Sequence, residues 1–226
     1  MSIDRRSELA RNLTTISERI SIAAKKVNRS PSDIKLIVVT KTFPITDLNL
    51  LYELGVRDFG ENRDQEASRK VAEMPNDINW HFQGQIQSNK LKSITNWASY
   101  IHSVDQFKYA KMISEFTGDR KKSIFLQISL DPIPESRGGV DPAKLHHLAS
   151  EISSLPNLKL MGLMAVAPLE ENTDHAFARV SKYHQRFMEH FPEAKYLSAG
   201  MSGDYESAIA HGATHLRIGS SILGNR

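Results

Sequence analysis

Hydrophobic and polar positions follow two alternating periods along the first quarter of the chain. Residues 3–28 carry apolar side chains at spacings of three and four, which predicts an amphipathic helix that Pro31 ends. The apolar run at 35–40 is rich in β-branched residues and predicts a strand. A second helix is expected between Pro44 and Gly55, because proline favours a helix start and glycine a helix end.

The same alternation of strand and helix patterns continues to the last residues. Further strands are predicted at 57–59, 80–83, 100–103, 124–129, 158–164, 196–198 and 215–218. Helical patterns lie between them, and the clearest run through 107–116 and 176–191. Strands that alternate with helices form a parallel sheet, and about eight of them favour closure into a (β/α)8 TIM-type barrel. An open doubly wound sheet remains the alternative, because no glycine-rich nucleotide loop helps to decide.

Length and composition fit one soluble domain over residues 1–226, with residues 1–30 forming a helix before the first strand. The 226 residues are 40% hydrophobic and 24% charged, and 29 Lys and Arg face 26 Asp and Glu. The small positive excess is scattered, so nucleic acid is not expected as a partner. There is no cysteine, which excludes disulfides, thiolate nucleophiles and cysteine-based zinc sites.

The beginning of the chain and its apolar runs bear on its location. The first ten residues are polar and mix acidic with basic side chains, unlike a secretory signal or a transit peptide. No stretch approaches the roughly 18 consecutive apolar residues of a membrane span. We therefore expect a cytoplasmic protein without a membrane partner.

One lysine stands where a barrel would place a reactive amine. Strand alternation puts Ile37, Val39 and Lys41 on one face, and inward facing would bring Lys41 to the barrel mouth. Partial burial there would disfavour the ammonium form, as a Schiff-base lysine requires. The alternative is a lysine that only marks where the strand meets water.

Two small-residue loops near the end of the chain suggest a phosphate site. Residues 198–203 (SAGMSG) follow the seventh predicted strand, and Gly219, Ser220 and Ser221 follow the eighth. Barrels commonly bind phosphate with these two loops, because small residues let backbone N–H groups approach an anion. Ordinary strand-to-helix turns are the alternative, since glycine and serine suit them as well.

A charged residue lies inside the last predicted strand. Alternation puts Leu216 and Ile218 on one face and Arg217 on the other, so Arg217 points inward if the apolar face meets the helices. Beside a lysine-bound pyridoxal 5'-phosphate (PLP), an arginine would serve as partner of the pyridine nitrogen. Guanidinium only donates hydrogen bonds, so that nitrogen would stay unprotonated. An ion pair with a neighbouring strand is the alternative.

Three more residues fall at predicted strand ends. His81 either contacts a ligand at the mouth or is a hydrogen-bonded core histidine. Glu61 and Asn62 are either site residues or a helix N-cap. The other histidines show no metal-ligand spacing with nearby carboxylates, so no metal site is predicted.

The ordered motifs resemble the pyridoxal phosphate homeostasis protein family, the proline synthase co-transcribed homologues, over nearly the whole chain. They include VVTKT at 38–42, FGEN at 59–62, WHF at 80–82, QSNK at 87–90, IHSVD at 101–105, GLM at 162–164, GMS at 200–202 and RIG at 217–219. Each motif alone is unspecific, but all of them in order are hard to obtain by chance.

The resemblance implies a barrel like the N-terminal domain of alanine racemase that holds PLP as an internal aldimine on Lys41. It also implies cofactor contacts from the residues that match the family's positions: Asn62, His81, Met201, Ser202, Arg217, Gly219 and Ser220. Members are thought to buffer or deliver PLP, with PLP-dependent apoenzymes as recipients, and to influence amino-acid pools. A monomer or weak homodimer is expected.

The chain departs from the family at three positions. Phe43 stands where many members have a second lysine, and Arg63 stands where a tyrosine is common. A second lysine that accepts PLP in transit is therefore in doubt. Arg137 keeps a basic residue where lysine is usual, in the long loop at 131–139 that would follow the fifth strand.

Three function classes fit a barrel lysine beside a phosphate loop. A PLP-dependent amino-acid racemase needs a second acid/base group, which related racemases take from a β-rich domain after the barrel, and we expect no such domain here. A Schiff-base aldolase for phosphosugars usually has its lysine late in the barrel, whereas Lys41 ends the first strand. A non-catalytic PLP-binding protein is therefore the predicted function.

Overall fold

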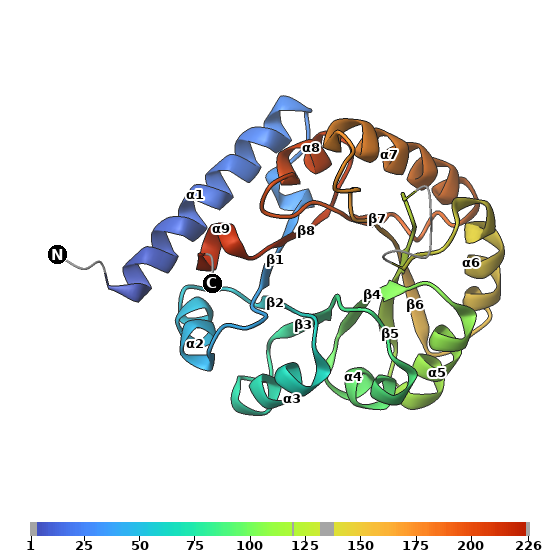
Figure 1. Cartoon of the computed structure of the whole chain (residues 1–226), viewed down its shortest axis with the longest axis horizontal. Helices are drawn as coiled ribbons and strands as arrows, with labels where there is room; N and C mark the ends of the chain where they lie inside the picture. The colour runs from blue at the N-terminus through green and yellow to red at the C-terminus, as the bar shows by residue number, and fades with distance from the viewer. Residues whose placement is uncertain (1–3, 119, 132–137, 225–226) are drawn as a thin grey trace.

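Eight parallel strands close into a barrel in chain order in a computed structural model that describes residues 4–118, 120–131 and 138–224. Each strand pairs with the next, and β8 pairs with β1 (Figure 1). The strands are β1 (Lys35–Val39), β2 (Asp58–Glu61), β3 (Asn79–Phe82), β4 (Tyr100–Val104), β5 (Lys122–Gln127), β6 (Leu158–Met164), β7 (Tyr196–Ser198) and β8 (His215–Ile218). The predicted barrel is confirmed, and the open sheet is wrong.

The hydrophobic pattern located the strands to within two residues at each end. The predicted and observed bounds agree for β6, β7 and β8. The largest difference is in β5, which begins at Lys122 because its N–H donates to the carbonyl of Asn157 at 2.9 Å. A charged residue thus starts an otherwise apolar strand, which the hydrophobic pattern alone does not predict.

A ring of helices covers the outside of the barrel (Figure 1). The α-helices are α1 (Arg5–Lys26), α2 (Ile45–Glu53), α3 (Asp64–Glu73), α4 (Leu91–Trp97), α5 (Phe107–Thr117), α6 (Leu145–Ser153), α7 (Thr173–His190), α8 (Tyr205–Ala210) and α9 (Ser220–Leu223). Short 3-10 turns lie at η1 (Pro31–Asp33), η2 (Ser88–Lys90) and η4 (Pro142–Lys144).

The helix before the first strand packs on the outside beside α8 and α9, next to the seam where β8 meets β1 (Figure 1). It ends at Lys26, and Asn28 follows in the left-handed conformation (φ 56°). The prediction that Pro31 ends the helix is therefore wrong. Pro31 instead begins a 3-10 turn. Gly55 closes α2 as predicted, with φ 94° just after the C-cap Leu54.

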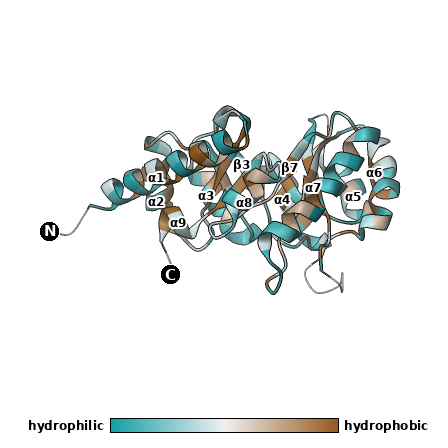
Figure 2. Cartoon of the chain, turned by 90° about the horizontal axis from the view of Figure 1, so that it is seen from above, coloured by the Kyte–Doolittle hydropathy of each residue, from teal (hydrophilic) through white to brown (hydrophobic). Residues whose placement is uncertain are grey.

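The apolar core has two parts, one on each side of the strands. The larger part lies between strands and helices and includes Val38, Leu216 and Ile218. Figure 2 shows hydrophilic and hydrophobic residues alternating along the helical ribbons, as expected of helices that bury one face. The smaller part, around Phe125 and Met164, lies in the barrel interior. No helix of the described residues is long and apolar enough to cross a membrane.

A glycine permits the close pairing of β6 with β7. Gly162 has φ 149° at a register shift in β6, and a Cβ there would lie 1.8 Å from the carbonyl oxygen of Tyr196.

We predict that Gly162→Ala lowers the free energy of unfolding by about 3 kcal/mol, because one of the two strands must move. Urea denaturation measures this loss. Gly203→Ala is the control, since nothing lies within 4 Å of a Cβ at Gly203, and an equal loss in both variants contradicts the prediction.

Candidate functional site

The predicted site residues gather at the carboxyl end of the barrel, where (β/α)8 proteins build their sites. Lys41 follows β1, and Asn62 follows β2. Met201 and Ser202 follow β7, and the segment from Gly219 follows β8. Because β8 pairs with β1, the last two loops and the lysine turn are neighbours around the barrel.

Lys41 lies in a strained turn at the end of β1. Ladder hydrogen bonding stops at Thr40, whose N–H donates to the carbonyl of Gly60 at 2.9 Å. Thr42 then takes φ 67°, a conformation that β-branched residues rarely adopt. Lys41 itself is exposed, so its predicted partial burial is wrong. The strand alternation that predicted an inward lysine no longer applies once the chain leaves the sheet.

A buried ion network supports this turn from the side of the helices. Lys70 of α3 donates to the carbonyl of Thr40 at 2.8 Å, to Oε1 of Glu61 at 2.7 Å and to Oε1 of Glu66 at 2.6 Å. Glu66 Oε1 also accepts the N–H of Thr42 at 2.6 Å. Backbone groups on both sides of the lysine therefore have fixed partners.

Glu61 belongs to this network. It is fully buried between β2 and the helices, and its Oε1 also accepts the hydroxyl of Thr40 at 2.7 Å. Burial raises the pKa of Glu61, while the bond from Lys70 opposes the rise. The N-cap alternative for Glu61 and Asn62 is wrong, because Arg63 occupies the N-cap position of α3.

The two small-residue loops contact each other. Ser202 Oγ accepts the N–H of Gly219 at 3.3 Å and the N–H of Ser221 at 3.4 Å, both long for such bonds. A Cβ at Gly219 would lie 3.1 Å from the carbonyl oxygen of Val39. The loop after β8 therefore lies close against the end of β1, two residues before Lys41.

Met201 and Ser220 flank these loops at the surface. Met201 is 39% exposed, and its N–H donates to Asp204 Oδ1 at 2.5 Å. Ser220 is exposed at the start of the short helix α9. Both predicted residues are thus accessible to solvent.

Arg217 points into the barrel, as the alternation predicted. It donates to Ser198 Oγ at 2.8 Å and to the carbonyl of Ala165 at 2.9 Å. Both partners are neutral, and burial lowers the pKa of Arg217 to about 10, although Asp204 partly opposes this. Among the described residues no carboxylate lies within ion-pair distance, so the proposed ion pair is absent.

His81 is a hydrogen-bonded core histidine, the second of its two predicted alternatives. Its side chain is fully buried and bonds Asp58 at 3.0 Å and His102 at 2.9 Å. The ring is therefore buried, and its contact with a cofactor stays a prediction. The sequence analysis missed His102 and Asp58. The alternation of side chains along β4 was a signal that His102 faces the barrel interior.

Asn62 carries an unused acceptor. Its Oδ1 is buried without a hydrogen-bond partner, which is uncommon for a buried polar atom. Gly84 lies against its backbone, where a Cβ would be 2.1 Å from the carbonyl oxygen of Asn62. Asn62 is therefore held closely at the mouth with one oxygen free to accept a donor.

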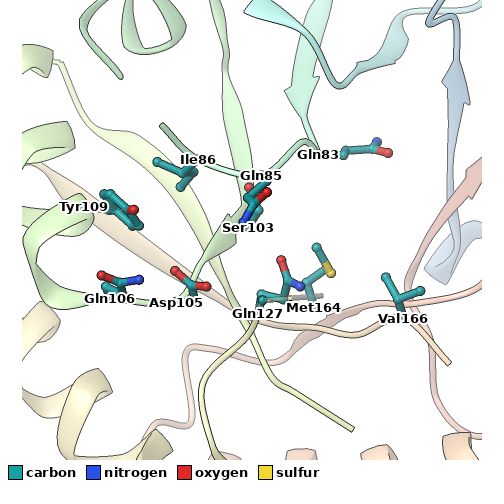
Figure 3. A pocket seen from close by; sticks show the side chains of 11 residues that line it. Gln83, Gln85, Ile86, Ser103, Asp105, Gln106, Tyr109, Gln127, Met164 and Val166 are labelled. Carbon is teal, nitrogen blue, oxygen red and sulfur yellow. The ribbon is translucent and has the colours of Figure 1, made fainter. Parts of the chain in front are cut away.

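A hollow of about 310 Å³ lies at the ends of β3 to β6. Its lining consists of Gln83, Gln85, Ile86, Ser103, Asp105, Gln106, Tyr109, Gln127, Gly138, Met164 and Val166. Figure 3 shows Asp105, Gln106 and Tyr109 on one side of it and Val166 on the other. The sequence did not predict this hollow, because scattered amides form no motif. Arg137 lies outside the described residues.

Comparison with known proteins identifies the class of this barrel. The family model described as alanine racemase, N-terminal domain, matches residues 11–226. Alanine racemase of Clostridium difficile superposes with a TM-score of 0.75 at 15% identity, over 97% of this chain and 57% of that chain. The molecule is thus a barrel of the alanine racemase N-terminal type.

Nearer relatives narrow the family. The pyridoxal phosphate homeostasis protein of Corynebacterium glutamicum is 42% identical over 217 residues, covering 92% of this chain and 97% of the relative. The structure of PipY from Synechococcus elongatus with PLP bound superposes with a TM-score of 0.80 at 34% identity, over 92% of this chain and all of that chain. The chain belongs to the pyridoxal phosphate homeostasis protein family.

The buried network beneath the lysine turn gives a pH-dependent prediction. Lys70→Met should lower the free energy of unfolding by about 3 kcal/mol near neutral pH, because Glu61 then stays buried without its cation. A carboxyl group whose pKa is raised on folding costs stability as pH rises, so the loss should be smaller at about pH 5 than at about pH 8. Urea denaturation at both pH values measures it.

Lys111→Met in α5 serves as the control for this variant, because Lys111 is exposed on a helix of similar length. A loss from Lys70→Met that does not depend on pH contradicts the assignment of Glu61 as the stranded charge.

Proposed function

We propose that this protein binds PLP, holds it covalently on Lys41, and buffers or delivers it to PLP-dependent apoenzymes. The observation that carries the proposal is the contact between the loop after β8 and the end of β1 at Gly219 and Val39. This contact supports the proposal because the loop after β8 is the one predicted to bind phosphate. The names of the relatives and the PLP-bound PipY structure support the same ligand.

The residues at the mouth fit the parts of PLP. Backbone N–H groups of Gly219 and Ser221 converge on one point, now occupied by the hydroxyl of Ser202, and would hold the phosphate. Asn62 supplies a free acceptor. Bound PLP supplies an aldehyde carbon that forms an imine with a primary amine and can exchange it for another amine.

Arg217 supports a binding role over catalysis. With a pKa of about 10 it stays protonated at neutral pH, and a guanidinium can only donate to the pyridine nitrogen. The ring nitrogen of bound PLP would then stay unprotonated, which would make the ring a weaker electron sink. Bond breaking at a bound amino acid would be slow, whereas the exchange of one amine for another does not need the sink.

The hollow at the ends of β3 to β6 bears on the racemase alternative. Two-base racemisation needs a second acid/base group on the face opposite Lys41. Of the residues that line the hollow, Asp105 and Tyr109 are the ionisable ones. Asp105 already accepts the N–H of Gly139 through Oδ2 at 3.0 Å. Tyr109 is thus the group on which a racemase alternative would depend.

Lys41→Ala should abolish the yellow imine band and the mass increase that borohydride fixes on the protein in the presence of PLP. The fold should persist, because Lys41 is exposed and the adjoining turn is held by Lys70 and Glu66. Absorbance and mass spectrometry of the reduced protein measure the outcome. Lys121→Ala, an exposed lysine before β5, is the control. Equal labelling of wild type and the Lys41 variant rejects Lys41 as the attachment site.

Racemisation of alanine or serine by the PLP-loaded protein should be negligible. Turnover of about 1 s⁻¹ or more would be in the enzymatic range and would favour the racemase alternative. Chiral chromatography of the reaction measures it. Tyr109→Phe then decides the source of any trace activity, since a racemase that uses this phenol would lose it.

A further inference from the structure

A chain of four hydrogen bonds crosses the barrel interior from Arg217 to Asp58. Arg217 Nη1 lies 2.8 Å from Ser198 Oγ, which lies 2.8 Å from His102 Nδ1. His102 Nε2 lies 2.9 Å from His81 Nδ1, and His81 Nε2 lies 3.0 Å from Asp58 Oδ1. Five strands contribute one residue each, so the chain links the mouth to the opposite end of the barrel.

The carboxylate end of this hydrogen-bond chain fixes the direction of its bonds when both imidazoles are neutral. A guanidinium can only donate and a carboxylate can only accept. Asp58 accepts from His81 Nε2–H, so the Nδ1 of a neutral His81 accepts from His102 Nε2–H, and the Nδ1 of a neutral His102 accepts from the hydroxyl of Ser198. Each imidazole then carries its proton on Nε2, and His102 donates to His81, which donates to Asp58. The reverse order would leave a lone pair of His81 facing the carboxylate.

Both rings are neutral links in this chain. His81 and His102 are fully buried, and burial lowers the pKa of each ring. Tyr100 stacks on His81 with centroids 4.5 Å apart, and Phe125 stacks on His102 at the same distance. These aromatic neighbours leave the imidazole rings little freedom to rotate. Stacking therefore favours the same ring orientation as the hydrogen bonds.

The far end is anchored by an ion pair near solvent. Lys35 Nζ lies 3.0 and 3.1 Å from the two carboxylate oxygens of Asp58. Burial alone would raise the pKa of Asp58, but the bonds from His81 and Lys35 outweigh it and lower the pKa. Asp58 is thus a stable anion at neutral pH, at the amino-terminal end of β2.

We propose that Asp58, His81 and His102 are positioning residues for the cofactor, which act through Ser198 on the guanidinium of Arg217. The inference rests on the proposed function, in which Arg217 contacts the pyridine nitrogen. With Nη1 on Ser198 and Nη2 on the carbonyl of Ala165, the guanidinium plane is fixed before PLP arrives. A donor that is already in place needs no reorganisation on binding.

The direction of the chain can be measured without cofactor. Nitrogen-15 chemical shifts of the imidazoles in the PLP-free protein report which ring nitrogen carries the proton. We expect the Nε2–H form for both His81 and His102. An Nδ1–H form at either ring overturns the proposed direction, and the positioning role with it.

Asp58→Asn tests the positioning role, because it keeps the side-chain shape and removes the charge that selects the Nε2–H form. We expect Nδ1–H signals to appear at His81, a shift of the yellow band, and a roughly tenfold loss of PLP affinity, the size of one charge-assisted hydrogen bond. Asp174→Asn is the matched control, since Asp174 pairs with the imidazole of His211 at 2.9 Å outside the barrel.

The outcomes separate this inference from the proposed function. Wild-type protein that fails to bind PLP refutes the proposed function. The tautomer measurement in the PLP-free protein still tests the direction of the hydrogen bonds from Arg217 to Asp58. Wild-type protein that binds PLP, with an Asp58→Asn variant of unchanged band and affinity, refutes the positioning role alone. A variant that is only less stable, with unchanged tautomers, also refutes it.

Discussion

The pairing of the first strand with the last is the constraint on which the site depends. Four residue pairs join β1 to β8, from Lys35 with His215 to Val38 with Ile218. This register puts the turn after β1 beside the loop after β8, although the two lie at opposite ends of the chain. A shift by one residue would turn the side chains of β8 to the other face, and Arg217 would leave the interior.

Polar groups hold the lysine end and the arginine end of the site from opposite sides of the barrel wall. Outside the wall, Lys70 and Glu61 fix the carbonyl and hydroxyl of Thr40. Inside it, His102 and Ser198 fix Arg217. Buried polar groups cost stability unless they are paired, so each network needs its full set of partners. These buried networks, and not the exposed residues of the mouth, hold the lysine turn and Arg217 in place.

The sequence predicted the order and bounds of the strands, because both depend on the local hydrophobic repeat. It also predicted that the loops after β7 and β8 are neighbours, because this depends on the order of the strands along the chain. The inward direction of Arg217 followed as well, since β8 keeps its alternation to Ile218. The exposure of Lys41 did not, because the ladder ends one residue before it. The partners of Glu61 and His81 lie on other elements, and a hydrophobic pattern carries no information about such pairs.

The exposure of Lys41 itself favours exchange over catalysis in the proposed role. An amine that is meant to be displaced must be reachable by another amine, and a wall of side chains over it would slow that approach. The strained turn at Thr42 keeps the lysine at the surface while its backbone neighbours stay bonded to Glu66 and Lys70. A racemase has the opposite need, since water that reaches its bound intermediate competes with the intended proton transfer. Fixing the backbone of the turn while leaving its side chain open is therefore the arrangement that a reversible holder of an aldehyde requires.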